Sequence, residues 1–229
     1  MDAPRPLRTT VLFVGPLTIA LVALFAFGWL ANEVVDGETA RFDAGVRALA
    51  HQTATPGLTV AMLAISFLGS VAAVVTIGAL AVGVCLSWRR RRAALLIAIT
   101  LGGAALLETG LKLAFHRSRP VPFFGTAPGS FAFPSGHALF AACLYGVLAA
   151  MLAAHARRTL VHVGIWCGAL LLIGLIGWSR IYLGVHYPSD VVAGYCVAAW
   201  WVGAVAFVDR TRGGEGWGGP ATPRPRVRA

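Results

Sequence analysis

The chain has 229 residues, of which 58% are hydrophobic and 12% are charged, and its mean hydropathy is +0.75. A soluble domain of this length could not bury so much apolar surface, so the composition excludes that class and predicts an integral membrane protein. The formal net charge of +10 could suggest a nucleic acid partner, but the distribution of the basic residues gives another explanation.

Six stretches are long and apolar enough to cross the hydrocarbon core, which takes about 20 residues per helix. We therefore predict an all-α fold, an integral membrane bundle of six transmembrane helices at residues 11–31, 57–88, 93–115, 137–154, 161–179 and 188–208. The second stretch is long enough to imply a tilted helix. We expect the first stretch to be a retained anchor and not a secretory signal, because it is long and lacks a clear small-residue cleavage site.

The segments between and after these stretches are polar. Residues 32–56 form a loop that we expect to contain a short amphipathic helix on the membrane surface, and residues 116–136 form a long loop rich in Pro, Gly and Phe. We predict one membrane domain at residues 1–212. Residues 213–229 are dense in Gly, Pro and Arg and have too little apolar material to fold, so we expect a disordered basic cytoplasmic tail there.

The 19 Lys and Arg residues are unevenly divided between the two sides of the predicted bundle. With the N-terminus inside, 13 fall on the cytoplasmic side and six on the opposite side. An excess of Lys and Arg in short cytoplasmic loops is the orientation signal of membrane proteins. The sequence therefore predicts a multi-pass protein with both termini cytoplasmic, and the charge requires no nucleic acid. The four Cys residues have spacings typical of neither a metal site nor a redox motif, so we expect no metal and no cofactor.

Ionisable residues gather at the outer ends of the later predicted helices, where such residues are costly and therefore functional candidates. They come from three separate segments and fall toward one membrane face: Glu108, Lys112, Arg117, Arg119, His137, Arg180, His186 and Asp190. The cations, the two histidines and the carboxylate of Asp190 form the set needed to bind and cleave a phosphate ester.

Phosphate binding can be divided among two kinds of group. Lys112, Arg119 and Arg180 can neutralise the charge on the phosphate oxygens. Ser135 and Gly136 open the fourth predicted helix, where free backbone N–H groups make an anion site. Because Gly136 has no side chain, a ligand can approach the backbone closely there. Arg117 is a further candidate for binding a phosphorylated head group.

The two histidines can divide the roles of nucleophile and general acid. Asp190, four residues after His186, can accept a hydrogen bond from one ring nitrogen and leave the other free to attack phosphorus, so we predict His186 as the nucleophile. His137 lies beside the helix-start anion site and is the predicted general acid. Pro188 is typical of the first turn of a helix, so the pattern leaves open whether His186 and Asp190 share one helical turn.

Three blocks resemble the signature of the type 2 phosphatidic acid phosphatase family, which includes bacterial lipid phosphatases and glucose-6-phosphatase and is related to the vanadium haloperoxidases. The first is Lys112, six residues and Arg119-Pro120, the second is Pro134-Ser135-Gly136-His137, and the third is Ser179-Arg180, five residues, His186, three residues and Asp190. The resemblance implies a metal-independent reaction through a phosphohistidine on His186, assisted by Asp190, with His137 acting on the leaving group. It also implies phosphate binding by Lys112, Arg119, Ser135, Gly136 and Arg180.

We therefore expect an integral membrane phosphatase that hydrolyses the terminal phosphate of a lipid phosphate or diphosphate, such as phosphatidic acid, phosphatidylglycerol phosphate or undecaprenyl diphosphate. Composition and short loops favour a bacterial inner membrane, with the active site on the outer, periplasmic face. Two alternatives stay open, a lipid phosphotransferase that uses the same phosphohistidine and a non-catalytic membrane protein that binds phosphate or lipid. A vanadate-dependent peroxidase is disfavoured because those relatives are soluble. The sequence selects neither a lipid nor an oligomeric state.

Overall fold

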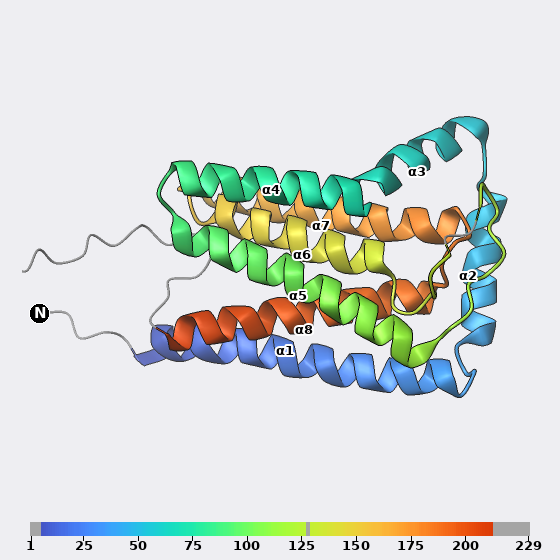
Figure 1. The fold of residues 1–229 in the computed structure, drawn as a ribbon, viewed down its shortest axis with the longest axis horizontal. Helices are drawn as coiled ribbons and strands as arrows, with labels where there is room; N and C mark the ends of the chain where they lie inside the picture. The colour runs from blue at the N-terminus through green and yellow to red at the C-terminus, as the bar shows by residue number, and fades with distance from the viewer. Residues whose placement is uncertain (1–5, 127–128, 213–229) are drawn as a thin grey trace, which may run out of the picture.

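The computed structural model describes residues 6–126 and 129–212, and these residues fold into helices joined by turns and loops (Figure 1). The helices in chain order are α1 (Pro6–Val35), α2 (Ala40–Gln52), α3 (Pro56–Leu68), α4 (Val71–Ser87), α5 (Arg91–Phe115), α6 (Gly136–Ala153), α7 (Thr159–Tyr182) and α8 (Pro188–Thr211). Among the described residues, five helices are long and apolar enough to cross a membrane, and the bent pair α3–α4 makes a sixth span if it counts as one. The predicted all-α, multi-pass membrane fold is confirmed. The predicted tail at residues 213–229 lies outside the described residues.

The predicted span at residues 57–88 is wrong in one respect, because it is not a single tilted helix. Its halves α3 and α4 meet at a bend of 47°. Gly69 ends α3, and the Ser70 hydroxyl caps α4 by accepting the Ala73 N–H at 3.2 Å. A side chain on Gly69 would collide with Ile176 and His137. The Gly-Ser pair therefore breaks the helix and also lets α6 and α7 approach the bend closely.

The polar segment at residues 32–56 contains the predicted amphipathic helix, α2, which lies across one end of the bundle at a steep angle to the long helices (Figure 1). Asp43 and Ala50 are buried on its inner face, whereas Phe42 and Leu49 are exposed on its outer face. Ala50 packs in an apolar cluster with residues of α6, α7 and α8. This helix therefore closes one end of the bundle.

The charged residues separate to the two ends of the bundle, as the sequence predicts. The turn between α4 and α5 and the loop between α6 and α7 lie at the end where α1 begins and α8 ends, and they carry Arg89 to Arg92, Arg157 and Arg158 (Figure 1). The opposite end, covered by α2, holds the end of α5, the loop at residues 116–135 and the turn between α7 and α8. The arginine-rich turns therefore lie at one end of the bundle, and the segments that carry the predicted site residues lie at the other.

Helix α1 runs along α8 (Figure 1), and Gly203 of α8 lies against the backbone of α1. A Cβ atom added there would lie 2.9 Å from the backbone oxygen of Pro16 and 3.2 Å from the backbone nitrogen of Ala20. Backbone atoms cannot rotate out of the way as a side chain can. The packing of α1 on α8 therefore depends on the missing side chain of Gly203.

We predict that Gly203→Ala lowers the free energy of unfolding by about 1–3 kcal/mol through overpacking. Gly28→Ala on α1 is the matched control, because an added Cβ there meets no atom within 4 Å. Alanine is a better helix former than glycine by about 1 kcal/mol, so the control should be as stable as the wild type or more stable. Thermal unfolding in detergent compares the variants, and equal midpoints for both would contradict close α1–α8 packing.

Candidate active site

The eight sequence-predicted site residues come together at the end of the bundle that α2 covers. They are contributed by the end of α5, the loop at residues 116–135, the start of α6 and the turn from α7 into α8: Lys112, Arg119, Ser135, Gly136, His137, Arg180, His186 and Asp190. Backbone contacts join these segments, since the N–H of Ser135 donates to the carbonyl of Asp190 at 2.9 Å and the N–H of His186 donates to the carbonyl of Arg180 at 3.3 Å. Three stretches that are distant in sequence therefore form one site.

His186 and Asp190 form a buried pair with exposed fractions of 1% and 0%. The His186 Nδ1 and Asp190 Oδ2 atoms are 3.2 Å apart. Helix α8 begins at Pro188, so the two residues do not share one turn of helix and meet across its start. The same Oδ2 atom accepts the backbone N–H of Tyr187 at 2.9 Å. The first turn of α8, where a negative charge is favoured, thus fixes the carboxylate beneath the imidazole.

Arg119 determines which nitrogen of His186 carries the proton. Its Nη1 atom is 2.9 Å from His186 Nε2, and a guanidinium can only donate hydrogen bonds. Nε2 therefore accepts with its lone pair, and Nδ1–H donates to Asp190. Burial, helped by the charges of Arg119 and Arg180 and opposed by Asp190, lowers the pKa of His186 to about 4. The ring is therefore neutral near pH 7, with a lone pair on Nε2.

Arg119 and Lys112 are held in place by neighbouring polar groups. The Arg119 guanidinium donates to the backbone carbonyls of Ser130 at 2.6 Å and of Val185 at 2.9 Å. The Ser130 hydroxyl accepts from Arg119 at 3.0 Å and from Lys112 at 3.4 Å. Lys112 also forms an ion pair with Glu108, one helical turn away, at 2.5 Å. Ser130, which the sequence analysis did not single out, therefore links the two cations.

Two buried polar atoms at the site have no hydrogen-bond partner within the described residues, and they are Ser135 Oγ and Arg180 Nε. Arg180 is otherwise held by Ser66, to whose hydroxyl its Nη1 donates at 2.5 Å. Buried polar atoms in proteins are nearly always hydrogen bonded, so unpaired ones require an explanation. Both atoms belong to residues predicted to bind phosphate, and a bound anion would satisfy them.

Gly136 and His137 occupy the first turn of α6, and Ser135 is the residue that precedes this helix. A Cβ atom on Gly136 would lie 2.7 Å from Glu108 Oε1, so glycine here lets the Glu108 side chain of α5 approach the start of α6 closely. His137 is partly buried and lies within electrostatic range of Arg180, His186, Arg119 and Lys112. The second histidine therefore shares the site with the first.

The structure adds a contact that the sequence analysis did not predict, between Asp43 of α2 and Arg117. The Arg117 guanidinium donates to Asp190 Oδ1 at 2.5 Å and to Asp43 Oδ2 at 2.8 Å. Asp43 is 1% exposed and also accepts the backbone N–H and the hydroxyl of Ser189 at 3.0 and 2.6 Å. Arg117 therefore has internal partners on α2 and α8, and its role in binding a head group stays a prediction. Asp43 could have been predicted from the sequence as an acidic residue on the apolar face of an amphipathic helix.

The geometry can be compared with known proteins. The model of the PAP2 superfamily matches residues 93–213, which is more than half of the chain. The chain belongs to the PAP2 superfamily. The stretch typical of this superfamily spans α5 to α8 and includes every sequence-predicted site residue, whereas Asp43 lies outside it.

Individual PAP2 relatives match shorter or longer parts of the chain. Phosphatidylglycerophosphatase B of Bacillus subtilis is 38% identical over 111 residues, covering 47% of this chain and 54% of that protein. Undecaprenyl-diphosphatase of Sulfolobus acidocaldarius is 29% identical over 104 residues, covering 45% and 46%. The chain spans about half the length of the curated relatives it matches. The crystal structure of a transmembrane PAP2-type phosphatidylglycerolphosphate phosphatase from Bacillus subtilis has a TM-score of 0.73 and 29% identity, covering 84% of this chain and 96% of that one.

We predict that Arg117→Gln lowers the free energy of unfolding by about 3–5 kcal/mol, because it leaves two buried carboxylates, Asp43 and Asp190, without their shared cation. Arg41→Gln is the matched control, since Arg41 is an exposed arginine of α2 at the same end of the bundle. It should change stability by less than about 0.5 kcal/mol. Thermal unfolding in detergent measures both, and a similar small effect for the two variants would refute the bridging role of Arg117.

The buried His186 predicts a pH dependence of stability. Because its pKa is about 4 in the folded protein and 6.5 ordinarily, the unfolded chain binds a proton between these values that the folded chain does not. Stability should therefore fall as the pH drops from about 6.5 toward about 4, with a slope of up to about 1.4 kcal/mol per pH unit from this residue. Thermal unfolding across that window should show a shallower decline for His186→Gln than for the wild type. Parallel curves would contradict the prediction.

Proposed function

We propose that the chain is a membrane phosphatase that removes the terminal phosphate of a lipid phosphate or diphosphate through a phosphohistidine on His186. The observation that carries the proposal is the state of the His186 ring. It is neutral, it donates from Nδ1 to Asp190, and its Nε2 lone pair accepts from Arg119, a hydrogen bond that the substrate phosphate replaces before attack. An imidazole oriented in this way by a carboxylate is prepared for nucleophilic attack.

The reaction divides into two displacements at phosphorus. In the first, His186 Nε2 forms a bond to phosphorus as the bond to the lipid oxygen breaks, and His137 gives that leaving oxygen a proton. In the second, a water oxygen forms a bond to phosphorus as the bond between phosphorus and His186 Nε2 breaks, and His137 accepts a proton from that water. The products are the dephosphorylated lipid and inorganic phosphate, and both histidines return to their initial states. Asp190 stabilises the positive charge that develops on His186 during the first step.

Cations and helix-start groups are proposed to bind the phosphate oxygens during both steps. Lys112, Arg119 and Arg180 supply the positive charge, and Ser135 and Gly136 supply donors at the start of α6. The unpaired Ser135 Oγ and Arg180 Nε atoms support this role, since each is buried beside the reacting groups and needs a polar partner. Among the described residues, no group of three or more His, Cys, Asp or Glu side chains is arranged to hold a metal ion.

The substrate class is inferred from the surroundings of the site and from the relatives. The site lies at one end of a membrane bundle, where a lipid can present its head group while its tail stays in the bilayer. Two relatives are named for the dephosphorylation of phosphatidylglycerophosphate and of undecaprenyl diphosphate. We propose a bacterial inner membrane location for one membrane domain, with both termini cytoplasmic and the site periplasmic. The concentration of arginines at the end opposite the site supports this orientation.

We predict that the purified chain releases phosphate from phosphatidic acid or undecaprenyl diphosphate in detergent with EDTA present. His186→Ala should lower the rate at least about 1000-fold, since it removes the nucleophile. His155→Ala is the control, because this exposed histidine lies at the opposite end of the bundle and should leave the rate unchanged. A rate that needed a divalent metal or survived His186→Ala would refute the mechanism. A newly phosphorylated lipid in place of free phosphate would instead identify a phosphotransferase.

A further inference from the structure

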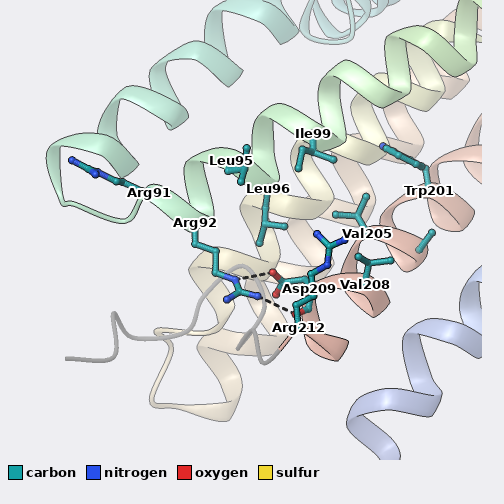
Figure 2. Close-up of a pocket in the computed structure, with 11 residues that line it drawn as sticks. Arg91, Arg92, Leu95, Leu96, Ile99, Trp201, Val205, Val208, Asp209 and Arg212 are labelled. Atoms are coloured by element: carbon teal, nitrogen blue, oxygen red, sulfur yellow. Dashed lines mark hydrogen bonds and ion pairs between the residues drawn. The ribbon is translucent and has the colours of Figure 1, made fainter. Parts of the chain in front are cut away.

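A cavity of about 610 Å³ lies between the start of α5 and the end of α8, at the end of the bundle opposite the candidate active site (Figure 2). Its wall is apolar over most of its length, with residues from both helices: Leu95, Leu96, Ile99, Trp201, Val205 and Val208. Arg91, Arg92, Asp209 and Arg212 line it as well. None of these residues belongs to the proposed phosphatase site.

The order of the lining residues along each helix makes one end of the cavity charged and the other end apolar. On α5, Arg91, Leu95 and Ile99 follow one another at intervals of four, so they share one helix face, and all three are exposed. On the α8 side, Val208 and Arg212 have the same spacing. Each helix therefore presents an arginine at the end of the bundle and apolar side chains further in, over about 12 Å from Arg91 to Ile99.

An ion pair within the cavity neutralises one of its arginines. Arg92 donates from Nε to Asp209 Oδ1 at 2.8 Å and from Nη2 to the Asp209 carbonyl at 3.0 Å, as Figure 2 shows. Asp209 is buried, so this pair fixes α5 against α8. No carboxylate of the described residues forms an ion pair with Arg91 or Arg212. Two positive charges therefore remain at this end of the cavity, and Figure 2 shows Arg212 beside Asp209 and the Arg91 side chain directed away from the other lining residues.

Trp201 lines the apolar end of the cavity, and its polar atom is already satisfied. The indole Nε1–H donates to the Thr100 carbonyl at 2.9 Å. The remainder of the ring offers an apolar surface to a ligand. A ligand that fills this cavity thus needs a negative group at one end and a hydrocarbon chain at the other.

We propose that this cavity binds an anionic phospholipid, with its phosphate at Arg212, within the attraction of the more distant Arg91, and part of one acyl chain along Leu95, Ile99 and Val208. Charge complementarity selects this occupant over a neutral lipid, because arginine pairs well with phosphate and each basic residue near a membrane surface adds to the attraction. The cavity is proposed as a binding site and not as a second catalytic site, since its described lining contains no histidine and its carboxylate, Asp209, is paired with Arg92. The inference does not depend on the proposed phosphatase activity.

The test uses the full-length chain in detergent and native mass spectrometry to count bound lipids during titration. Phosphatidylglycerol is the probe, because it carries a phosphodiester and no terminal phosphate to be removed, and phosphatidylcholine is the neutral comparison. Phosphatidylglycerol should bind at least about tenfold more tightly, as expected for two basic residues. Equal binding of the two lipids would overturn the proposal.

Two sets of variants locate the binding. Arg91→Gln combined with Arg212→Gln should weaken phosphatidylglycerol binding about tenfold. Arg157→Gln combined with Arg158→Gln removes the same charge from exposed positions at the same end and should leave binding unchanged. Ala204→Trp, which fills the apolar part, should also weaken binding, whereas His186→Ala should not. An equal loss in both arginine pairs, no effect of Ala204→Trp, or a loss in His186→Ala would each refute this site.

Discussion

The buried carboxylate of Asp190 is the group on which the rest of the site depends. One oxygen contacts the Nδ1 atom of His186 and the backbone N–H of Tyr187, and the other accepts from Arg117. A carboxylate without exposure to water would be costly as an ion unless it were paired and hydrogen bonded. Arg117 and the start of α8 supply those partners, so the charge can be retained. That charge holds the proton on Nδ1 and leaves Nε2 of His186 with its lone pair.

The polar contacts around Asp190 continue into α2, which makes this short helix part of the site. Arg117 joins Asp190 to Asp43, and Asp43 also receives two hydrogen bonds from Ser189 in the first turn of α8. In the middle of the bundle, by contrast, buried residues such as Leu139 and Val197 form apolar clusters. Loop carbonyls and helix starts at the bundle end offer hydrogen-bond partners that regular helices do not. Such a network of charges is therefore stable at the end of the bundle.

The sequence predicted much of this architecture because two simple physical signals carry it. Apolar length predicted the long helices, ionisable residues at helix ends predicted six of the eight site residues, and the start of the fourth predicted helix added Ser135 and Gly136. The bend at Gly69 was missed because hydropathy continues unbroken through it, and only the contacts with α6 and α7 explain it. The role of Asp43 was missed because its partners, Arg117 and Ser189, lie 74 and 146 residues away. Pairings of this kind depend on how the helices are arranged, which no local pattern contains.

The two ends of the bundle use arginine in opposite ways. At the active-site end, Arg117 and Arg119 are held by carboxylates, backbone carbonyls and a histidine, so their positions are set before any ligand arrives. At the other end, Arg91 and Arg212 extend from exposed positions beside an apolar cavity. Fixed cations suit a reaction, because stabilising a transition state requires donors that do not reorganise. Exposed cations suit attraction to a charged membrane surface, where the positions of the lipid head groups vary.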